Sequence, residues 1–413
     1  MLEASATECP LREIVHRSYP SERTVTVRCT VRPAQGGAPA DGYGTATTEP
    51  VARLKALSEA VERLVACTPF ATVARPPTTL TRHPPFRASG VRTVPDDSPS
   101  RVYRPLHGGE PLRVPLYWSS PWIAGRELRA GALTPPEARL SSTVGWAVAP
   151  TPEAALHGAL LELTELLNYG VFLHRCLRGA DRSAEPARGA ADAPDVSGDP
   201  GGPSTSAPDR SAPGTLVLPL GGVVRTPTAL AVAYRPGRLM PATGLGCGAT
   251  RAEATDRALL ELAQAETLWR SNPTAVPAER FFLRRFERWP LLGRCATLDF
   301  DLSGHRTPYG DEMSPASPLE ELEAGGISVW ADSGAVDISG PDIPRTRLCF
   351  AHVVSDPQPL LGLVRAGIPV FDTGEVRRTL DPPRRDSRPD RSDRRRSADR
   401  RAAGRDGRGR RSA

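Results

Sequence analysis

The chain has 413 residues, 39% of them hydrophobic, which is enough to bury a large core and excludes a small scaffold held together by disulfides or metals. A formal net charge of +6 would suggest nucleic acid as a partner. However, Asp381–Ala413 alone hold 13 Arg and 6 Asp, a net charge of +7, which leaves −1 for everything before them. Because the body is close to neutral, the composition argues against nucleic-acid binding.

The cysteines and the N-terminus indicate a cytoplasmic protein. The seven cysteines are scattered, with no CxxC pair and no paired histidines at metal-ligand spacing, so neither a disulfide framework nor a zinc site is expected. The N-terminal residues lack the apolar core of a signal peptide, and no apolar run approaches the roughly 18 residues that a membrane helix needs. We therefore expect no membrane partner.

The first predicted elements in chain order are a strand and a helix. Arg23–Arg32 alternates apolar and polar residues, as a strand does. Gly42–Thr47 (GYGTAT) is a small-residue approach to the helix predicted over Thr48–Ala66. A threonine suited to an N-cap opens that helix, and apolar residues then recur at spacings of three and four.

The same order of approach and helix occurs twice more. Ser142–Pro150 leads into a helix predicted over Thr151–Leu167, and Ala242–Ala249 leads into a helix predicted over Thr250–Trp269. Further strands are predicted at Thr215–Pro219, Leu230–Tyr234 and Leu348–Val354. Strands followed by helices, with some strands adjacent in sequence, favour an α/β (α+β) domain with a mixed sheet and three related helix-bearing segments.

Two segments are predicted to be disordered. Residues 179–214 consist almost entirely of small, polar, Pro and Gly residues, with no apolar periodicity that could offset the entropy of ordering them. Residues 381–413 are a solvated tail rich in Arg and Asp. Residues 1–178 and 215–380 are therefore predicted to form a single domain.

The three helices carry carboxylates in a repeated position. Glu59 and Glu62 lie three residues apart on the first helix, and Glu162 and Glu165 repeat that spacing on the second. Each pair places like charges on one helical face, which is locally unfavourable unless a cation relieves it. Glu261 on the third helix follows Arg257 by four residues and precedes Gln264 by three. Converging carboxylates would hold magnesium, but solvated surface glutamates would show the same spacing.

At these residues the sequence resembles the YcaO family. The first segment, Gly42-Tyr43-Gly44 followed by Glu59, Glu62 and Arg63, is similar to the family's GKG approach and ExxER helix. The second, Ser142–Ala149 followed by Glu162 and Glu165, resembles the segment in which SNGLAAG precedes another ExxER. The third, with Arg257, Glu261 and Gln264, resembles the RxxxExxQ end of the GSGxH segment.

The resemblance implies an ATP-dependent enzyme that activates backbone amides of a ribosomally made precursor peptide. In such enzymes a Cys, Ser or Thr side chain adds to an amide carbonyl, the oxygen is phosphorylated and eliminated, and an azoline results (cyclodehydratase). Alternatives are thioamide formation by the same ATP chemistry and a degenerate scaffold of a peptide-modifying complex that does not catalyse. Natural-product biosynthesis, such as that of a bacteriocin, is the expected setting.

The resemblance also assigns residues. Glu62, Glu162, Glu165 and Glu261 would be ligands of Mg²⁺ or their supports, and Glu59 and Arg257 would lie at ATP. Arg63 matches the motif and would pair with a phosphate or with a carboxylate. Lys55 could reach phosphates, because the lysine of the family's GKG is Tyr43 here. No catalytic residue is assigned.

Several positions depart from the family pattern. Gly158 and Leu166 stand where the family has Gln and Arg around the second ExxE, and Gly248 replaces the histidine of the third loop. The proline-rich PxPxP ending of azoline-forming members is absent, and an Arg/Asp tail stands in its place. These departures leave both an altered chemistry and the scaffold alternative open.

The partners follow from the same resemblance. About 40 residues precede the first family segment, and they have the pattern of strands of the main domain. Since leader peptides usually add a strand to a small recognition domain, we expect a separate partner protein to recognise the leader of the precursor peptide. The sequence does not fix the oligomeric state, and a homodimer is one option.

Overall fold

The computed structural model describes residues 7–67, 99–134, 138, 141–183, 214–222, 224–284, 286–287, 290–300, 302, 317–340 and 343–359. All of these residues belong to one compact unit, Met1–Asp372. No helix among them combines the length and the apolar character that a bilayer crossing requires.

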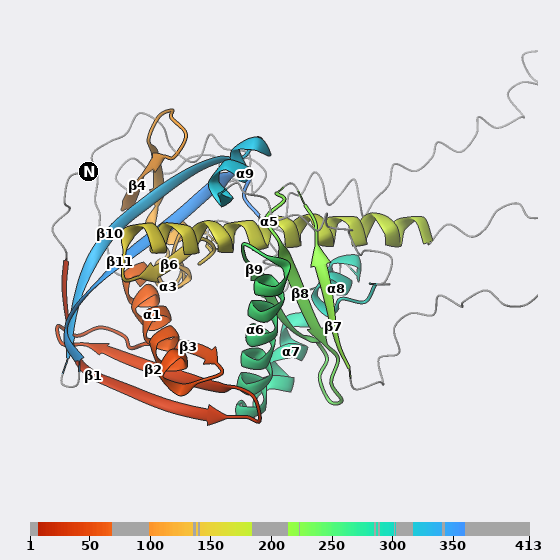
Figure 1. Cartoon of the computed structure of the whole chain (residues 1–413), viewed down its shortest axis with the longest axis horizontal. Coiled ribbons are helices and arrows are strands. Elements are labelled where there is room, and N and C mark those ends of the chain that lie inside the picture. Colours follow the sequence, from red (N-terminus) through yellow and green to blue (C-terminus); the bar gives the residue numbers. More distant parts are fainter. Residues whose placement is uncertain are drawn as a thin grey trace, which may run out of the picture. The chain divides into compact units, whose positions relative to one another are not determined.

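The larger sheet is mixed (Figure 1). Its strands are β1 (Thr7–Pro20), β2 (Val25–Pro33), β3 (Ala40–Ala46), β4 (Ser100–Pro105), β5 (Leu112–Pro115), β6 (Trp146–Ala149), β10 (Ser328–Gly340) and β11 (Ile343–Asp356). Within the described residues the order is β3-β2-β1-β10-β11-β6, with β4 paired to β10 and β5 paired to β4. β1 runs parallel to β10, and the other neighbours are antiparallel. The prediction of an α/β fold with a mixed sheet is confirmed.

A smaller antiparallel sheet consists of β7 (Thr215–Leu220), β8 (Thr228–Ala233) and β9 (Ala242–Cys247), in that order. Helix α6 (Arg251–Ser271) packs on β9 and β8 and also contacts β3 of the larger sheet. The core between α6 and its sheet is built mostly from alanines, which lets helix and strands approach closely.

Two further helices complete the framework of the site. Helix α1 (Glu49–Cys67) packs on β3 and β2, where its alanines and valines share one core cluster with both strands. Helix α5 (Pro152–Ser183) contacts strands of both sheets (Figure 1). Because α5 is common to both sheets, it brings the α1 and α6 sides of the fold to one place.

Shorter helices lie outside this framework, and the sequence patterns did not predict them. They are η2 (Leu116–Trp118, a 3₁₀ turn), α3 (Pro121–Arg129), α7 (Ala275–Arg284), α8 (Pro290–Thr297) and α9 (Pro318–Ala324). Two of them begin at clear caps. Ser120 accepts a hydrogen bond from the Ile123 N–H, and Ser317 forms a capping box with Glu320.

The β2–β3–α1 unit and the β8–β9–α6 unit repeat one another in register. Val31 pairs with Ala40 in the first unit, as Ala233 pairs with Ala242 in the second, and each residue lies 202 positions after its counterpart. The glycines of the second strands repeat as well. A Cβ on Gly44 would lie 2.6 Å from the Cβ of Lys55, and a Cβ on Gly246 would lie 2.8 Å from the Cβ of Arg257. Glycine is needed because helix and strand touch there.

Helices α1 and α6 and strands β2, β7, β8 and β11 lie at or around their predicted segments, whereas β4, β5 and β10 were not predicted and α5 runs well beyond its predicted end at Leu167. Helix α5 continues through Ser183, so its last five residues fall inside the segment 179–214 that was predicted to be disordered. An amphipathic helix can extend past its last buried turn, and composition alone does not reveal this. Residues 184–213 and the tail 381–413 lie outside the described residues.

The close approach at Gly44 gives a stability prediction. Gly44→Ala would place a methyl group against the backbone of Ala52 and Ala56, so we expect the free energy of unfolding to fall by about 1–3 kcal/mol. Gly170→Ala in α5 is the matched control, because nothing lies within 4 Å of its Cβ position and alanine favours a helix. Urea denaturation measures both. If Gly44→Ala were as stable as the control, the close packing of α1 on β3 would be wrong.

Candidate functional site

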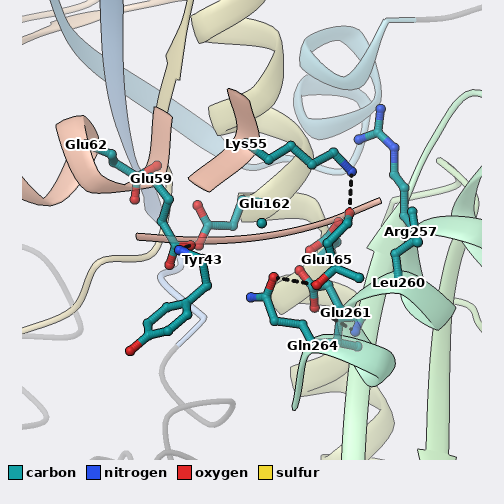
Figure 2. A pocket seen from close by; sticks show the side chains of 13 residues that line it. Tyr43, Lys55, Glu59, Glu62, Glu162, Glu165, Arg257, Leu260, Glu261 and Gln264 are labelled. Atoms are coloured by element: carbon teal, nitrogen blue, oxygen red, sulfur yellow. Dashed lines mark hydrogen bonds between the residues drawn. The ribbon is translucent and has the colours of Figure 1, made fainter. Parts of the chain in front are cut away.

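Carboxylates from three helices line one cavity of about 530 Å³. Glu59 and Glu62 come from α1, Glu162 and Glu165 from α5, and Glu261 from α6 (Figure 2). The rest of the lining is Tyr43, Gly44, Thr45, Lys55, Leu245, Arg257, Leu260 and Gln264. The structure thus brings together the acidic residues that the sequence singled out, although they span two hundred positions of the chain.

Strand β3 and its neighbours orient the acidic residues of α1. The Tyr43 backbone N–H donates to Glu59 Oε2 at 2.6 Å, and Arg63 forms an ion pair with the other oxygen of Glu59. Arg63 also donates to the Asp41 carbonyl at 2.6 Å, and its guanidinium lies 5.6 Å from the centroid of the Tyr43 ring. Arg63 is absent from the cavity lining. Of the two roles that the sequence left open for Arg63, the geometry shows the carboxylate pair.

Backbone N–H groups also orient the carboxylates of α5 and α6. The Gly145 N–H donates to Glu162 Oε2 at 3.2 Å, and the Leu245 N–H donates to Glu261 Oε2 at 3.0 Å. The Cys247 backbone likewise hydrogen-bonds to Glu165. Gly145 and Leu245 each precede the helix that carries their carboxylate, whereas Cys247 reaches Glu165 of α5 from the approach to α6. These backbone amides were missed at the sequence level, and the recurrent glycines were the available signal.

Burial and mutual repulsion raise the pKa of the acidic side chains. Burial is the larger cause for Glu62, Glu162 and Glu165, and neighbouring carboxylates raise the pKa of each further, well above its ordinary range. Burial also raises the pKa of Glu261 to about 7. The carboxyl group of Glu261 is surrounded by protein, but its side chain is still open to the cavity, and the other three side chains are half-buried. Water in the cavity therefore screens part of the repulsion between them.

Two cations face these carboxylates across the cavity. Lys55 donates to the Thr45 carbonyl at 3.3 Å and points toward the side on which Arg257 lies (Figure 2). Burial and then the charge of Arg257 lower the pKa of Lys55, whereas Glu261 opposes that shift. Tyr43 contributes its backbone to the site, but its ring points away from the carboxylates (Figure 2).

A second lobe of about 340 Å³ shares part of this lining. Both spaces border on Glu162, Glu165, Leu245, Arg257 and Glu261. The second lobe adds Gly158, Leu161 and Leu166, all from α5. Gly158 and Leu166 are two of the positions that depart from the family pattern, and together they give this lobe a wall without charge beside the acidic groups.

The donor set fits a hard dication bound to phosphate. Carboxylate oxygens are the ligands that Mg²⁺ prefers, and Lys55 and Arg257 can meet an anion beside it. Gln264 adds an amide, and its Oε1 lies 3.2 Å from the Thr45 hydroxyl that donates to it. Among the described residues, no three acidic, histidine or cysteine side chains are already gathered as ligands of one metal ion. Carboxylates that repel one another are expected to lie apart when no cation is bound, and a bound cation would draw them together.

The raised pKa values predict how magnesium and pH act together. Without Mg²⁺ the folded protein holds protons more tightly than the unfolded chain, so its stability should fall as pH rises from about 4.5 through about 7. Mg²⁺ needs the ionised groups, so it should raise the melting temperature more at pH 8 than at pH 6.

Thermal unfolding with and without MgCl₂ at both pH values measures this effect. Glu162→Gln should flatten the pH profile and reduce the magnesium effect, whereas Glu153→Gln, an exposed change on the same helix, should do neither. A magnesium effect that is larger at pH 6 would contradict the prediction.

The comparison with solved structures supports the fold. No protein-family model matches the chain, and no curated protein matches its sequence. Among solved structures, YcaO from Methanopyrus kandleri, bound with AMPPCP and Mg²⁺, has a TM-score of 0.55 at 19% identity, covering 86% of this chain and 89% of that one. The E. coli microcin synthetase complex McbBCD, with pro-MccB17 bound, gives a TM-score of 0.47 at 13% identity, covering 84% of this chain and 87% of that one. The likeness to the Methanopyrus kandleri protein shows that the chain has the fold of a YcaO protein, as the resemblance in its sequence predicts.

Proposed function

We propose that this protein is an ATP-dependent enzyme of the YcaO type that activates backbone amides of a ribosomally made precursor peptide and forms azolines from Cys, Ser or Thr. The observation that carries the proposal is the single cavity in which carboxylates of α1, α5 and α6 face Lys55 and Arg257. Such a cavity can neutralise a metal-bound polyphosphate from both sides. The fold shared with the Methanopyrus kandleri protein, whose structure holds AMPPCP and Mg²⁺, supports the same choice of ligand.

The acidic residues would have two roles. Glu62, Glu162, Glu165 and Glu261 would hold Mg²⁺, while Glu59, fixed by the Tyr43 N–H and Arg63, would keep the acidic wall in place. When bound, Mg²⁺·ATP would supply the phosphoryl group that makes an amide oxygen a good leaving group.

The protein's own contribution to this reaction is position and charge. Arg257 and Lys55 offer donors to phosphate oxygens, and Glu253 holds the guanidinium of Arg257 at 2.7 Å. The lobe beside Leu161 and Leu166 would receive the peptide, because it adjoins the carboxylates and presents an uncharged wall. Charged groups that are fixed before the ligand arrives need little reorganisation during the reaction.

The proposal includes a division of labour with a partner. Recognition of the leader segment would belong to a separate protein, so the isolated chain should bind ATP but process a precursor poorly until that partner is present. Vigorous processing by the isolated chain would argue against a separate recognition partner, while leaving the nucleotide site in place.

Magnesium-dependent ATP binding tests the proposed site. Calorimetry should show ATP binding that needs Mg²⁺ and that Glu162→Gln/Glu261→Gln weakens by about 100-fold or more, because a charged hydrogen-bonding group is worth about 1.5–3 kcal/mol and two are lost. Glu153→Gln/Asp256→Asn is the matched control, since it changes exposed acids on the same two helices. A folded wild-type protein that does not bind ATP would favour a scaffold without catalysis.

A further inference from the structure

Lys55 and Arg257 occupy equivalent positions in the two repeated units. Each follows the central glycine of its strand by eleven residues, and each presents its Cβ to that glycine, Gly44 in one unit and Gly246 in the other. Both side chains line the same cavity. The repeat therefore brings two cations to one space from opposite units of the fold.

The two cations differ in what already holds them. Arg257 forms an ion pair with Glu253 one turn earlier, and Glu253 in turn accepts from the Ala249 N–H at 3.0 Å. The counterpart of Glu253 in the first unit is Val51, which is exposed and apolar. Lys55 consequently has no ion pair within the described part of the chain. Its hydrogen bond goes to a neutral carbonyl, that of Thr45.

Lys55 is also the only lysine in 413 residues, against 52 arginines. An ammonium is a compact point charge with three rotatable donors, whereas a guanidinium is a planar fork. At a position matched by an arginine in the other unit, Lys55 can therefore follow phosphate oxygens that a fixed fork cannot reach. Val51, one turn earlier on α1, offers no carboxylate, and Glu59, one turn later, is already held by the Tyr43 N–H and by Arg63.

We propose that Lys55 is the cation by which the first repeated unit binds the polyphosphate of the nucleotide, opposite Arg257 of the second unit. The inference rests on the proposed function, because it assigns a role within the same nucleotide site. It adds a requirement on the ligand: a chain of phosphates should engage both units, and a single phosphate should engage Lys55 weakly.

The single lysine allows a direct spectroscopic test. Reductive methylation with ¹³C-formaldehyde labels Lys55 and the terminal amine, and Lys55→Arg identifies the lysine signal by its loss. With Mg²⁺ present, ATP and inorganic tripolyphosphate should each shift the Lys55 signal, whereas AMP should shift it little. The signal of the terminal amine should stay in place. A Lys55 signal that ATP leaves unmoved would overturn the inference.

Calorimetry on unmodified protein gives an independent readout. Lys55→Gln should weaken ATP binding by about 10- to 100-fold, AMP binding by less than about threefold, and Lys55→Arg should restore part of the loss. Arg53→Gln is the matched control, because Arg53 lies on the same helix in an exposed pair with Glu49 and should leave binding unchanged.

The outcomes separate the inference from the function on which it rests. If Lys55→Gln binds ATP as tightly as the wild-type protein does, the role of Lys55 is overturned and the proposed function stands. Wild-type protein that fails to bind ATP at all would overturn both. If Lys55→Gln fails to fold, the wild-type spectrum still decides.

Discussion

Repulsion between carboxylates is the constraint on which the rest of this structure depends. Glu62, Glu162 and Glu165 line one cavity, and a neighbouring carboxylate raises the pKa of each of them. Packing must hold them there against that repulsion. Alanines and glycines provide it, because they let α1 and α6 lie directly on their strands, and α5 spans both sheets between them.

The outer edge of β3 shows how stability and the site share the same residues. The Asp41 carbonyl accepts from Arg63, the Tyr43 N–H donates to Glu59, and the Thr45 carbonyl accepts from Lys55. An exposed strand edge invites pairing with another chain, and here side chains of α1 occupy it. The same contacts fix the direction of Glu59 and place Lys55 at the cavity. We infer that the same contacts from α1 both protect the edge of β3 and orient the residues of the site. In the second unit the hydrogen bond from the Leu245 N–H to Glu261 repeats one of them.

The sequence predicted the acidic residues of the site because their spacing recurs on helices with clear caps and apolar periodicity. It could not predict which donors orient them, since a backbone N–H carries no residue identity. Strand β10 escaped prediction because Asp332 and Gly334 interrupt its apolar alternation. The fold explains both: Asp332 pairs with the buried Arg101, and Gly334 makes room for the Phe350 ring. The pairing of Arg63 with Glu59 was one of two options in the sequence, and only the fold favours it.

In the proposed enzyme, carboxylates from all three helices hold one metal–nucleotide group. Anomalous diffraction from crystals grown with Mn²⁺ and AMPPCP tests it most directly, because manganese takes the same oxygen ligands as magnesium and its position is seen without ambiguity. We predict manganese within about 2.0–2.3 Å of carboxylate oxygens from α1, α5 and α6, with phosphate between Lys55 and Arg257. Manganese bound outside this cavity, or held by a single helix at its rim, would contradict the account.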